Sequence, residues 1–148
     1  EGGEAQNQIT ARVTLKGTAR WLRDEDQVTI EQGLGRIADG IAQTFGVRAT
    51  FSFRAGVGVT ANHAAERDLA AEAAAAVTDV RRDVLPAMTG EDFAWFLREV
   101  PGAFVWIGNG PAENGRELHH PRYDFNDDIL PVAAKFLAET AKRALAGN

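Results

Sequence analysis

The hydrophobic pattern between residues 47 and 57 constrains the fold of this chain more than any other feature. Every second residue there is apolar, and the residues between them are mostly polar or basic. The apolar positions are Val47, Ala49, Phe51, Phe53, Ala55 and Val57. A period of two is typical of a strand with one buried face and one wet face. The pattern therefore predicts a half-buried strand, and such a strand belongs to a sheet that a helix covers on one side.

The residues before this strand predict the rest of the same lobe. Residues 4–22 alternate in the same way and predict two further strands. A helix is expected to begin at Asp24, a favourable N-cap residue with Gln27 three positions later, and to end at Gly46. Its apolar positions follow helical spacing at Ile30, Leu34, Ile37, Ile41 and Phe45. Together these elements predict an α/β lobe in which one helix lies across a sheet.

The second half of the chain predicts three helices, two short strands and one long loop. The elements expected in order are helix 64–77, strand 78–86, helix 90–100, strand 103–107, loop 108–127 and helix 128–146. Thr89 is expected to cap the middle helix. Strand 103–107 is apolar enough to be covered on both faces. Long loops inside compact domains are often functional, so the loop 108–127 is of particular interest.

The composition excludes several classes of function. With 16 basic and 21 acidic residues the formal charge is -5, and no basic stripe is present, so nucleic acid is not an expected partner. The chain has no cysteine, which excludes disulfides, thiolate metal ligands and a cysteine nucleophile. The only serine, Ser52, lies in a predicted strand, so no serine triad is expected. No run of about 18 apolar residues occurs, and no membrane-spanning helix is predicted.

Residues suited to chemistry concentrate between Thr89 and Asp128. His119 and His120 are adjacent, so their side chains point to different sides and at most one of them binds a given metal ion. Imidazole is a common zinc ligand, but a loop histidine is also an ordinary surface residue. Glu91 opens a helix, where an acidic side chain complements the positive end of the helix dipole.

Two further residues stand out in the first half of the chain. Asn62 follows a predicted strand and precedes a predicted helix, which is typical of an N-cap or turn residue. Arg20 is next to the apolar Trp21 on a strand and faces solvent or a cleft. The two Gly-x-Gly fragments, at 56–58 and 108–110, lack the spacing of a phosphate-binding loop, so a nucleotide site is not expected.

Five short motifs, taken in order, resemble one enzyme family. They are Gly2-Gly3-Glu4-Ala5-Gln6-Asn7, Gly17-Thr18-Ala19-Arg20, Asn62, Gly90-Glu91-Asp92-Phe93, and Leu118-His119 before Pro121. Their order and spacing resemble the C-terminal part of the metal-dependent amidohydrolases and metallopeptidases that include hippurate hydrolase, N-acyl-amino-acid deacylase and indole-acetyl-amino-acid hydrolase. The resemblance extends over essentially the whole chain. The family has a small polar residue where this chain has His120, and its usual Asn-Val-Ile-Pro run is replaced here by Asn7-Gln8-Ile9-Thr10.

The resemblance implies an α/β fold in two partial domains. Residues 1–77 are expected to form most of an incomplete, ferredoxin-like α+β lid lobe, and residues 78–148 the C-terminal part of an α/β catalytic domain. The implied activity is hydrolysis of a hippurate-like N-acyl amino acid by water that two metal ions activate. Because the family's other ligands and its general-base glutamate lie upstream, we expect a fragment of a longer cytoplasmic protein. By itself this fragment is expected to be inactive and to bind no metal.

The resemblance also implies roles for four residues. His119 matches the family's last metal ligand. Arg20 and Asn62 match lid positions that approach the substrate's carboxylate or the developing oxyanion. Glu91 matches an acidic residue that supports the metal site without binding the metal. The metal stays open among zinc, manganese and nickel, because histidine and carboxylate ligands suit all three.

An alternative from another class is a non-enzymatic α/β interaction module that dimerises through its sheet, with incidental histidines. A homodimer through the lid lobe is also expected of the hydrolase, because unpaired strand edges tend to pair with another chain. The coding sequence upstream of Glu1 distinguishes the two hypotheses. Metal-ligand motifs there would support the hydrolase, and a start codon near Glu1 would support the module.

Overall fold

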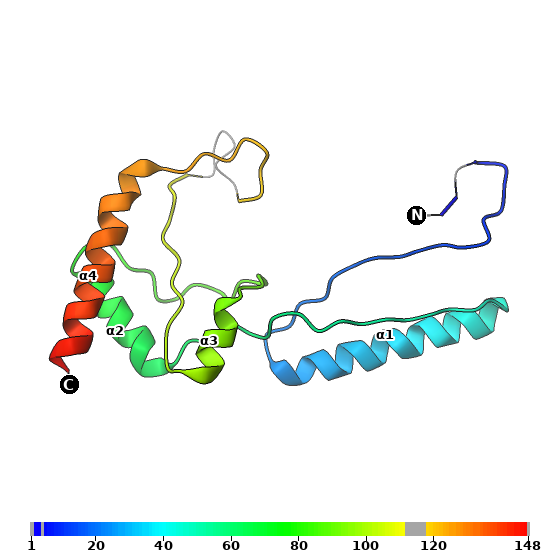
Figure 1. The fold of residues 1–148 in the computed structure, drawn as a ribbon, viewed down its shortest axis with the longest axis horizontal. Helices are drawn as coiled ribbons and strands as arrows, with labels where there is room; N and C mark the ends of the chain where they lie inside the picture. The colour runs from blue at the N-terminus through cyan, green and yellow to red at the C-terminus, as the bar shows by residue number, and fades with distance from the viewer. Residues whose placement is uncertain (1, 4, 112–117, 148) are drawn as a thin grey trace. The chain divides into compact units, whose positions relative to one another are not determined.

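The computed structural model describes residues 2–3, 5–111 and 118–147. Its elements in chain order are α1 (Asp24–Phe45), α2 (Ala64–Ala75), α3 (Phe93–Glu99), the 3-10 helix η2 (Asp127–Ile129) and α4 (Leu130–Ala146) (Figure 1). The chain divides into two compact units, residues 1–55 and residues 56–148, which we call unit 1 and unit 2. The expected boundary after residue 77 concerns two domains of a longer protein and stays a prediction. In the described chain no helix combines the length and apolar character needed to cross a membrane.

The predicted α/β fold class, with its ferredoxin-like lid, is wrong, because the described residues form helices and no strand or sheet. The segments predicted as strands are 4–22, 47–57, 78–86 and 103–107, of which only Glu4 lies outside the described residues. Alternation determines which side chains share a face, but a strand forms only when its backbone pairs with a neighbour. The sequence pattern contains no information on whether such a neighbour is present.

α1 is the helix predicted in unit 1, and both of its ends have a local cause. Arg23 precedes it in an extended conformation, one residue before the predicted N-cap at Asp24. The Arg23 guanidinium donates to the Asp26 carboxylate over 2.9 Å, and this hydrogen bond, with the attraction of the two charges, raises the pKa of Arg23. Gly46 ends the helix in the left-handed conformation, at a φ of 64°, which confirms the predicted stop at this glycine.

Unit 1 holds its extended segments together through aromatic rings. The ring of Phe53 lies 6.5 Å from that of Trp21 and 6.5 Å from that of Phe51. Phe51 in turn packs on α1 at Gly35, where an added methyl group would meet the ring at 3.5 Å. The large apolar residues left exposed along the helix include Leu34 (42%), Ile37 (59%), Ile41 (54%) and Phe45 (71%). None of the residues of α1 is buried, so this helix contributes no core of its own.

In unit 2, α2 and α4 pack side by side around a small core (Figure 1). Ala70 and Ala73 on α2 contact Phe136 on α4, and all three are buried. Ala103, from the segment after α3, packs against this cluster and is half-buried. Because alanine side chains are small, the ring of Phe136 supplies most of the apolar surface that this cluster removes from water.

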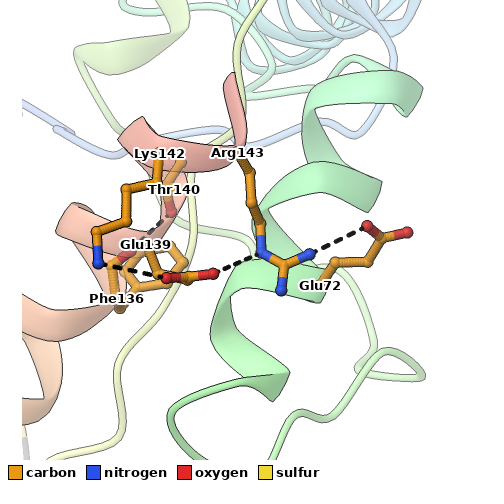
Figure 2. Close-up of polar contacts among 6 residues, drawn as sticks. All are labelled: Glu72, Phe136, Glu139, Thr140, Lys142 and Arg143. Carbon is orange, nitrogen blue, oxygen red and sulfur yellow. Dashed lines mark hydrogen bonds and ion pairs between the residues drawn. The ribbon is translucent and has the colours of Figure 1, made fainter. Parts of the chain in front are cut away.

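Charged side chains join the same two helices at the surface (Figure 2). Arg143 on α4 contacts Glu139 one turn earlier, with 3.1 Å between Nε and Oε1, and Glu72 on α2, with 3.6 Å between Nη1 and Oε2. Lys142 lies 4.0 Å from the other carboxylate oxygen of Glu139. Since these side chains are partly or largely exposed, each pair contributes less than about 1 kcal/mol.

The helices predicted in unit 2 are present with shifted ends. α2 ends at Ala75, two residues earlier than predicted. The N-cap of α3 is Asp92, so the predicted cap at Thr89 is wrong. The last helix begins with η2, where the side chain of Asn126 accepts a hydrogen bond from the N–H of Asp128 over 3.2 Å. Between α3 and η2 lies the predicted loop, of which residues 112–117 are outside the described residues.

Candidate functional site

The segment at residues 102–106 lies at the centre of the candidate site in unit 2. Ala103 packs on the α2–α4 core, whereas the rings of Phe104 and Trp106 meet edge to face with centroids 5.3 Å apart. Side chains that alternate between two faces are the mark of an extended backbone. The prediction that this segment is covered on both faces is wrong, because Val105 (40%), Trp106 (56%) and Ile107 (41%) stay exposed.

Asn62 and His63 bond one edge of this segment as a neighbouring strand would. Oδ1 of Asn62 accepts from the N–H of Phe104, and its Nδ2 donates to the C=O of the same residue, both over 2.8 Å. The N–H of His63 donates to the C=O of Gly102 over 3.0 Å, and the N–H of Gly102 donates to Nδ1 of His63 over 3.2 Å. Two consecutive residues thus satisfy the backbone groups that Gly102 and Phe104 present along this edge.

The sequence predicts two roles for Asn62, an N-cap or turn residue and a contact with the substrate. The N-cap of α2 is His63 and not Asn62. The expected contact between Asn62 and a substrate stays a prediction. In the structure, both polar atoms of the Asn62 amide are bonded to the backbone of Phe104.

Phe104 also connects the segment with the turn that carries Glu91. Its ring centroid lies 5.8 Å from that of Phe93, the first residue of α3. Glu91 stands two residues earlier, is half-buried, and its C=O accepts the N–H of Ala94 over 3.1 Å. The structure therefore joins two predicted site residues, Asn62 and Glu91, through one pair of aromatic rings. The carboxylate of Glu91 also lies at a helix start, where negative charge is favourable.

His119 and His120 differ in both backbone and partners. His119 has a φ of 67° and is the only non-glycine residue in the described chain with a left-handed backbone. Nδ1 of His120 accepts the N–H of Arg122 over 3.1 Å, and its C=O accepts the N–H of Tyr123 over 2.9 Å. His120 therefore stabilises the turn of its own loop. The His119 side chain is exposed and makes no hydrogen bond to any residue that the structure describes.

A second asparagine, Asn109, lies just beyond the other end of this segment and was not among the predicted site residues. Its Oδ1 accepts the N–H of Asn126 over 2.8 Å and its Nδ2 donates to the C=O of Asp124 over 3.2 Å. Asparagine beside glycine in a loop is typical of residues that bond backbone groups. That local signal was present at Gly108-Asn109-Gly110, but nothing in the sequence indicates partners 15 and 17 residues away.

Arg20 belongs to unit 1, whereas Asn62, Glu91 and His119 belong to unit 2. The Arg20 side chain is exposed, and its Nη1 donates to the neighbouring C=O of Ala19 over 3.1 Å. Its guanidinium fork suits a carboxylate, which it binds through two parallel hydrogen bonds.

The described side chains do not by themselves fit a metal ion. Within residues 2–3, 5–111 and 118–147, no three His, Cys, Asp or Glu side chains gather closely enough to hold one. Protein zinc sites take three or four such ligands, so a single exposed imidazole at position 119 does not complete a site.

Comparison with known proteins assigns the chain to a family. The sequence model of peptidase family M20/M25/M40 matches residues 1–143, so the chain belongs to this family, and the resemblance to metal-dependent amidohydrolases is confirmed. The chain is 30% identical over 141 residues to an N-acetylcysteine deacetylase of Bacillus subtilis (strain 168). It is 33% identical over 144 residues to an N-acetyldiaminopimelate deacetylase of Streptococcus thermophilus (strain CNRZ 1066).

These two alignments cover 95% of the chain but only 36% and 37% of the relatives, so the chain spans little more than a third of their length. No solved structure matches the chain.

Proposed function

We propose that this chain is part of a metal-dependent amidohydrolase that cleaves the amide bond of an N-acyl amino acid. The observation that carries the proposal is the family match over residues 1–143, and the names of two relatives, both deacetylases of N-acetyl compounds, support it. In this reaction water adds to the acyl carbonyl carbon and the C–N bond breaks, which yields a carboxylic acid and a free amino acid. We include hippurate-like substrates, in which the acyl group is aromatic.

The site residues have distinct proposed roles. Arg20 binds the substrate carboxylate through its guanidinium. Asn62 positions the turn that carries Glu91, and Glu91 supports the metal site without binding the metal. His119 is the proposed metal ligand, and its exposed imidazole, unlike that of His120, is not used by its own turn.

A divalent ion such as zinc, manganese or nickel polarises the carbonyl and activates water when it is bound. The described residues do not form a complete metal site, and we propose that the remaining ligands come from another part of a longer protein. The 148-residue chain is therefore proposed to be inactive alone and to bind no metal tightly.

Hydrolysis assays test this proposal on the 148-residue chain and on the longer protein to which we assign it. Hippurate, N-acetylcysteine and N-acetyldiaminopimelate serve as substrates, with each of the three metals. We expect turnover by the longer protein only, and a loss of at least about 100-fold in His119→Ala. The matched control is His120→Ser, which places the family's small polar residue there and is expected to keep activity. Turnover by the isolated chain would contradict its assignment as a fragment, and no turnover of any N-acyl amino acid by the longer protein would contradict the function.

We also propose that unit 1 mediates a homodimer through α1. Residues Leu34, Ile37, Ile41 and Phe45 recur at intervals of three and four, so they form one stripe on the helix, and all are exposed. A contiguous apolar stripe of this kind is typical of an interaction surface. Sedimentation equilibrium is expected to show a dimer that Ile41→Glu disrupts and that Gln43→Glu, on the same helix, does not.

The outcome of that experiment also bears on the non-enzymatic alternative. A dimer with no hydrolytic activity in the longer protein would favour an interaction module. That module would not associate through a sheet, because the described residues form none. A monomer at every concentration would contradict the proposed dimer.

A further inference from the structure

We infer that Asn62 is a positioning residue that fixes the Glu91 turn through Phe104 and Phe93, and that it does not contact the substrate. The effect of this positioning role on catalysis rests on the proposed amidohydrolase function. Its structural part rests on unit 2 alone and can be tested without any enzymatic activity.

The first step is the geometry of the Asn62 amide. Its acceptor oxygen and its donor nitrogen both bond to the backbone of one residue, Phe104, 42 positions away, over 2.8 Å each. This pairing fixes both the plane and the direction of the amide, because a flipped amide would oppose donor to donor and acceptor to acceptor. The amide therefore cannot turn toward a ligand without breaking at least one of two short hydrogen bonds.

The second step is that Phe104 has little freedom to move independently of Asn62. The adjoining His63 bonds both the N–H and the C=O sides of Gly102. In addition, a Cβ atom at Gly102 would approach Cδ2 of Leu97, a buried residue of α3, to 3.1 Å. The backbone from 102 to 104 is thus enclosed between the residues 62–63 and α3.

The third step connects Phe104 with Glu91. The ring of Phe104 contacts that of Phe93, at 5.8 Å between centroids and 43° between planes. Phe93 is the first residue of α3, and the turn before it is closed by two bonds, from the N–H of Ala94 to Glu91 and from the N–H of Trp95 to Asp92, of 3.1 and 3.0 Å. A displacement of Phe104 therefore moves Phe93, and with it the backbone of the turn that carries the Glu91 side chain.

Asn109 provides the matched comparison within the same molecule. Like Asn62, it uses both its amide oxygen and its amide nitrogen to bond backbone groups of residues far along the chain. It lies just after the segment 102–106. Its partners, Asp124 and Asn126, lie directly before η2 and outside α3. Removing its amide should therefore disturb a different region.

The experiment is a comparison of backbone amide resonances in the 148-residue chain by ¹H–¹⁵N NMR. Asn62→Ala is expected to shift the resonances of Glu91, Asp92 and Phe93, whereas Asn109→Ala is expected to shift those of Asp124 and Asn126 and to leave 91–93 in place. Asn62→Asp keeps the acceptor for the N–H of Phe104 and loses the donor, so its shifts at 91–93 should be smaller. Unmoved resonances at 91–93 in both Asn62 variants would overturn the inference. If Asn62→Ala does not fold, Asn62→Asp alone decides in the same way.

A kinetic measurement on the longer protein then separates positioning from substrate contact. A positioning role predicts that Asn62→Ala lowers kcat by about 10-fold or more and leaves KM within about twofold. A main effect on KM, with unmoved resonances at 91–93, would mean that Asn62 binds substrate. Absence of hydrolysis in the unmodified longer protein would count against the proposed function only, since the NMR comparison stands by itself.

Discussion

Units 1 and 2 contain the same kind of extended segment but hold it in different ways. In unit 1, the segment before residue 55 meets its helix through the ring of Phe51, and no described residue of this unit is buried. In unit 2, Ala103 packs on a buried cluster, and Asn62 bonds the edge of the same segment. An extended backbone can therefore be fixed without a sheet where loop side chains satisfy its polar groups. In unit 1, by contrast, the side chains that bond extended backbone join near neighbours, as Thr10 does with Arg12 and Arg20 with Ala19.

The largest expected effect is the removal of the main core residue of unit 2. Phe136 is 7% exposed, and Phe136→Ala should lower the free energy of unfolding of unit 2 by about 3–5 kcal/mol, because it removes a buried ring and leaves a cavity. Urea unfolding with hydrogen exchange read separately for the two units measures this effect. The adjacent Leu137, which is 64% exposed, is the control. An equal loss in Leu137→Ala would mean that the α2–α4 cluster is not the core.

A smaller loss is expected where the extended segment of unit 2 meets α3. Gly102→Ala places a methyl group 3.1 Å from Cδ2 of Leu97, and such overpacking costs about 1–3 kcal/mol. Gly108→Ala, where no atom lies within 4 Å of the added methyl group, should be nearly neutral. Thermal unfolding of the two variants side by side gives the difference. Equal melting temperatures would show that the segment is not enclosed in solution.

A still smaller loss of stability is expected when the side-chain cap of η2, a single hydrogen bond, is removed. Asn126→Ala removes the acceptor for the N–H of Asp128 and should cost about 1 kcal/mol. Asn126→Ser restores an acceptor and should recover most of that loss, while both variants keep the N–H that bonds Asn109. Hydrogen exchange of the amides at the start of α4 is the measurement. No difference between the alanine and serine variants would exclude a capping role.

The smallest effect is expected on the exposed stripe of α1. Because Ile41 is 54% exposed, Ile41→Ala should change the unfolding free energy of the dilute chain by less than about 0.5 kcal/mol. If the proposed dimer buries this face, the same substitution becomes more destabilising as the protein concentration rises. Unfolding curves at several concentrations test both statements. A large effect at high dilution would mean that the stripe is buried within the monomer.

The helices were predictable because their determinants are local. Gly46 ends α1 by a backbone conformation that glycine adopts readily, and the 3.6-residue period of its apolar positions is contained in the helix itself. The strands were not predictable in the same way, because a strand also needs a partner that alternation does not specify. At 47–57 the alternating pattern is present, yet no paired strand is found for it among the described residues.

The site was predicted only in outline for a similar reason. The motif around Glu91 and the paired histidines are visible in the sequence, and the family they indicate is confirmed. The hydrogen bonds of Asn62 and His63 connect residues 42 and 39 positions apart, a separation that leaves no sequence pattern. The proposed role of Arg20 depends on a substrate carboxylate, and that of His119 depends on a metal ion. Both roles therefore stay predictions.

If His119 is the proposed metal ligand, its backbone conformation and its function favour different residues at this position. At a φ of 67°, glycine is the residue that folds with the least strain, and asparagine is tolerated better than most. A saturation library at this position, sorted only for folded protein, should therefore enrich glycine and asparagine and deplete valine and isoleucine. A library sorted for hydrolysis by the longer protein should instead retain histidine alone. The gap between the two sorted populations would measure how far this position has been kept for its imidazole at the expense of an easier turn.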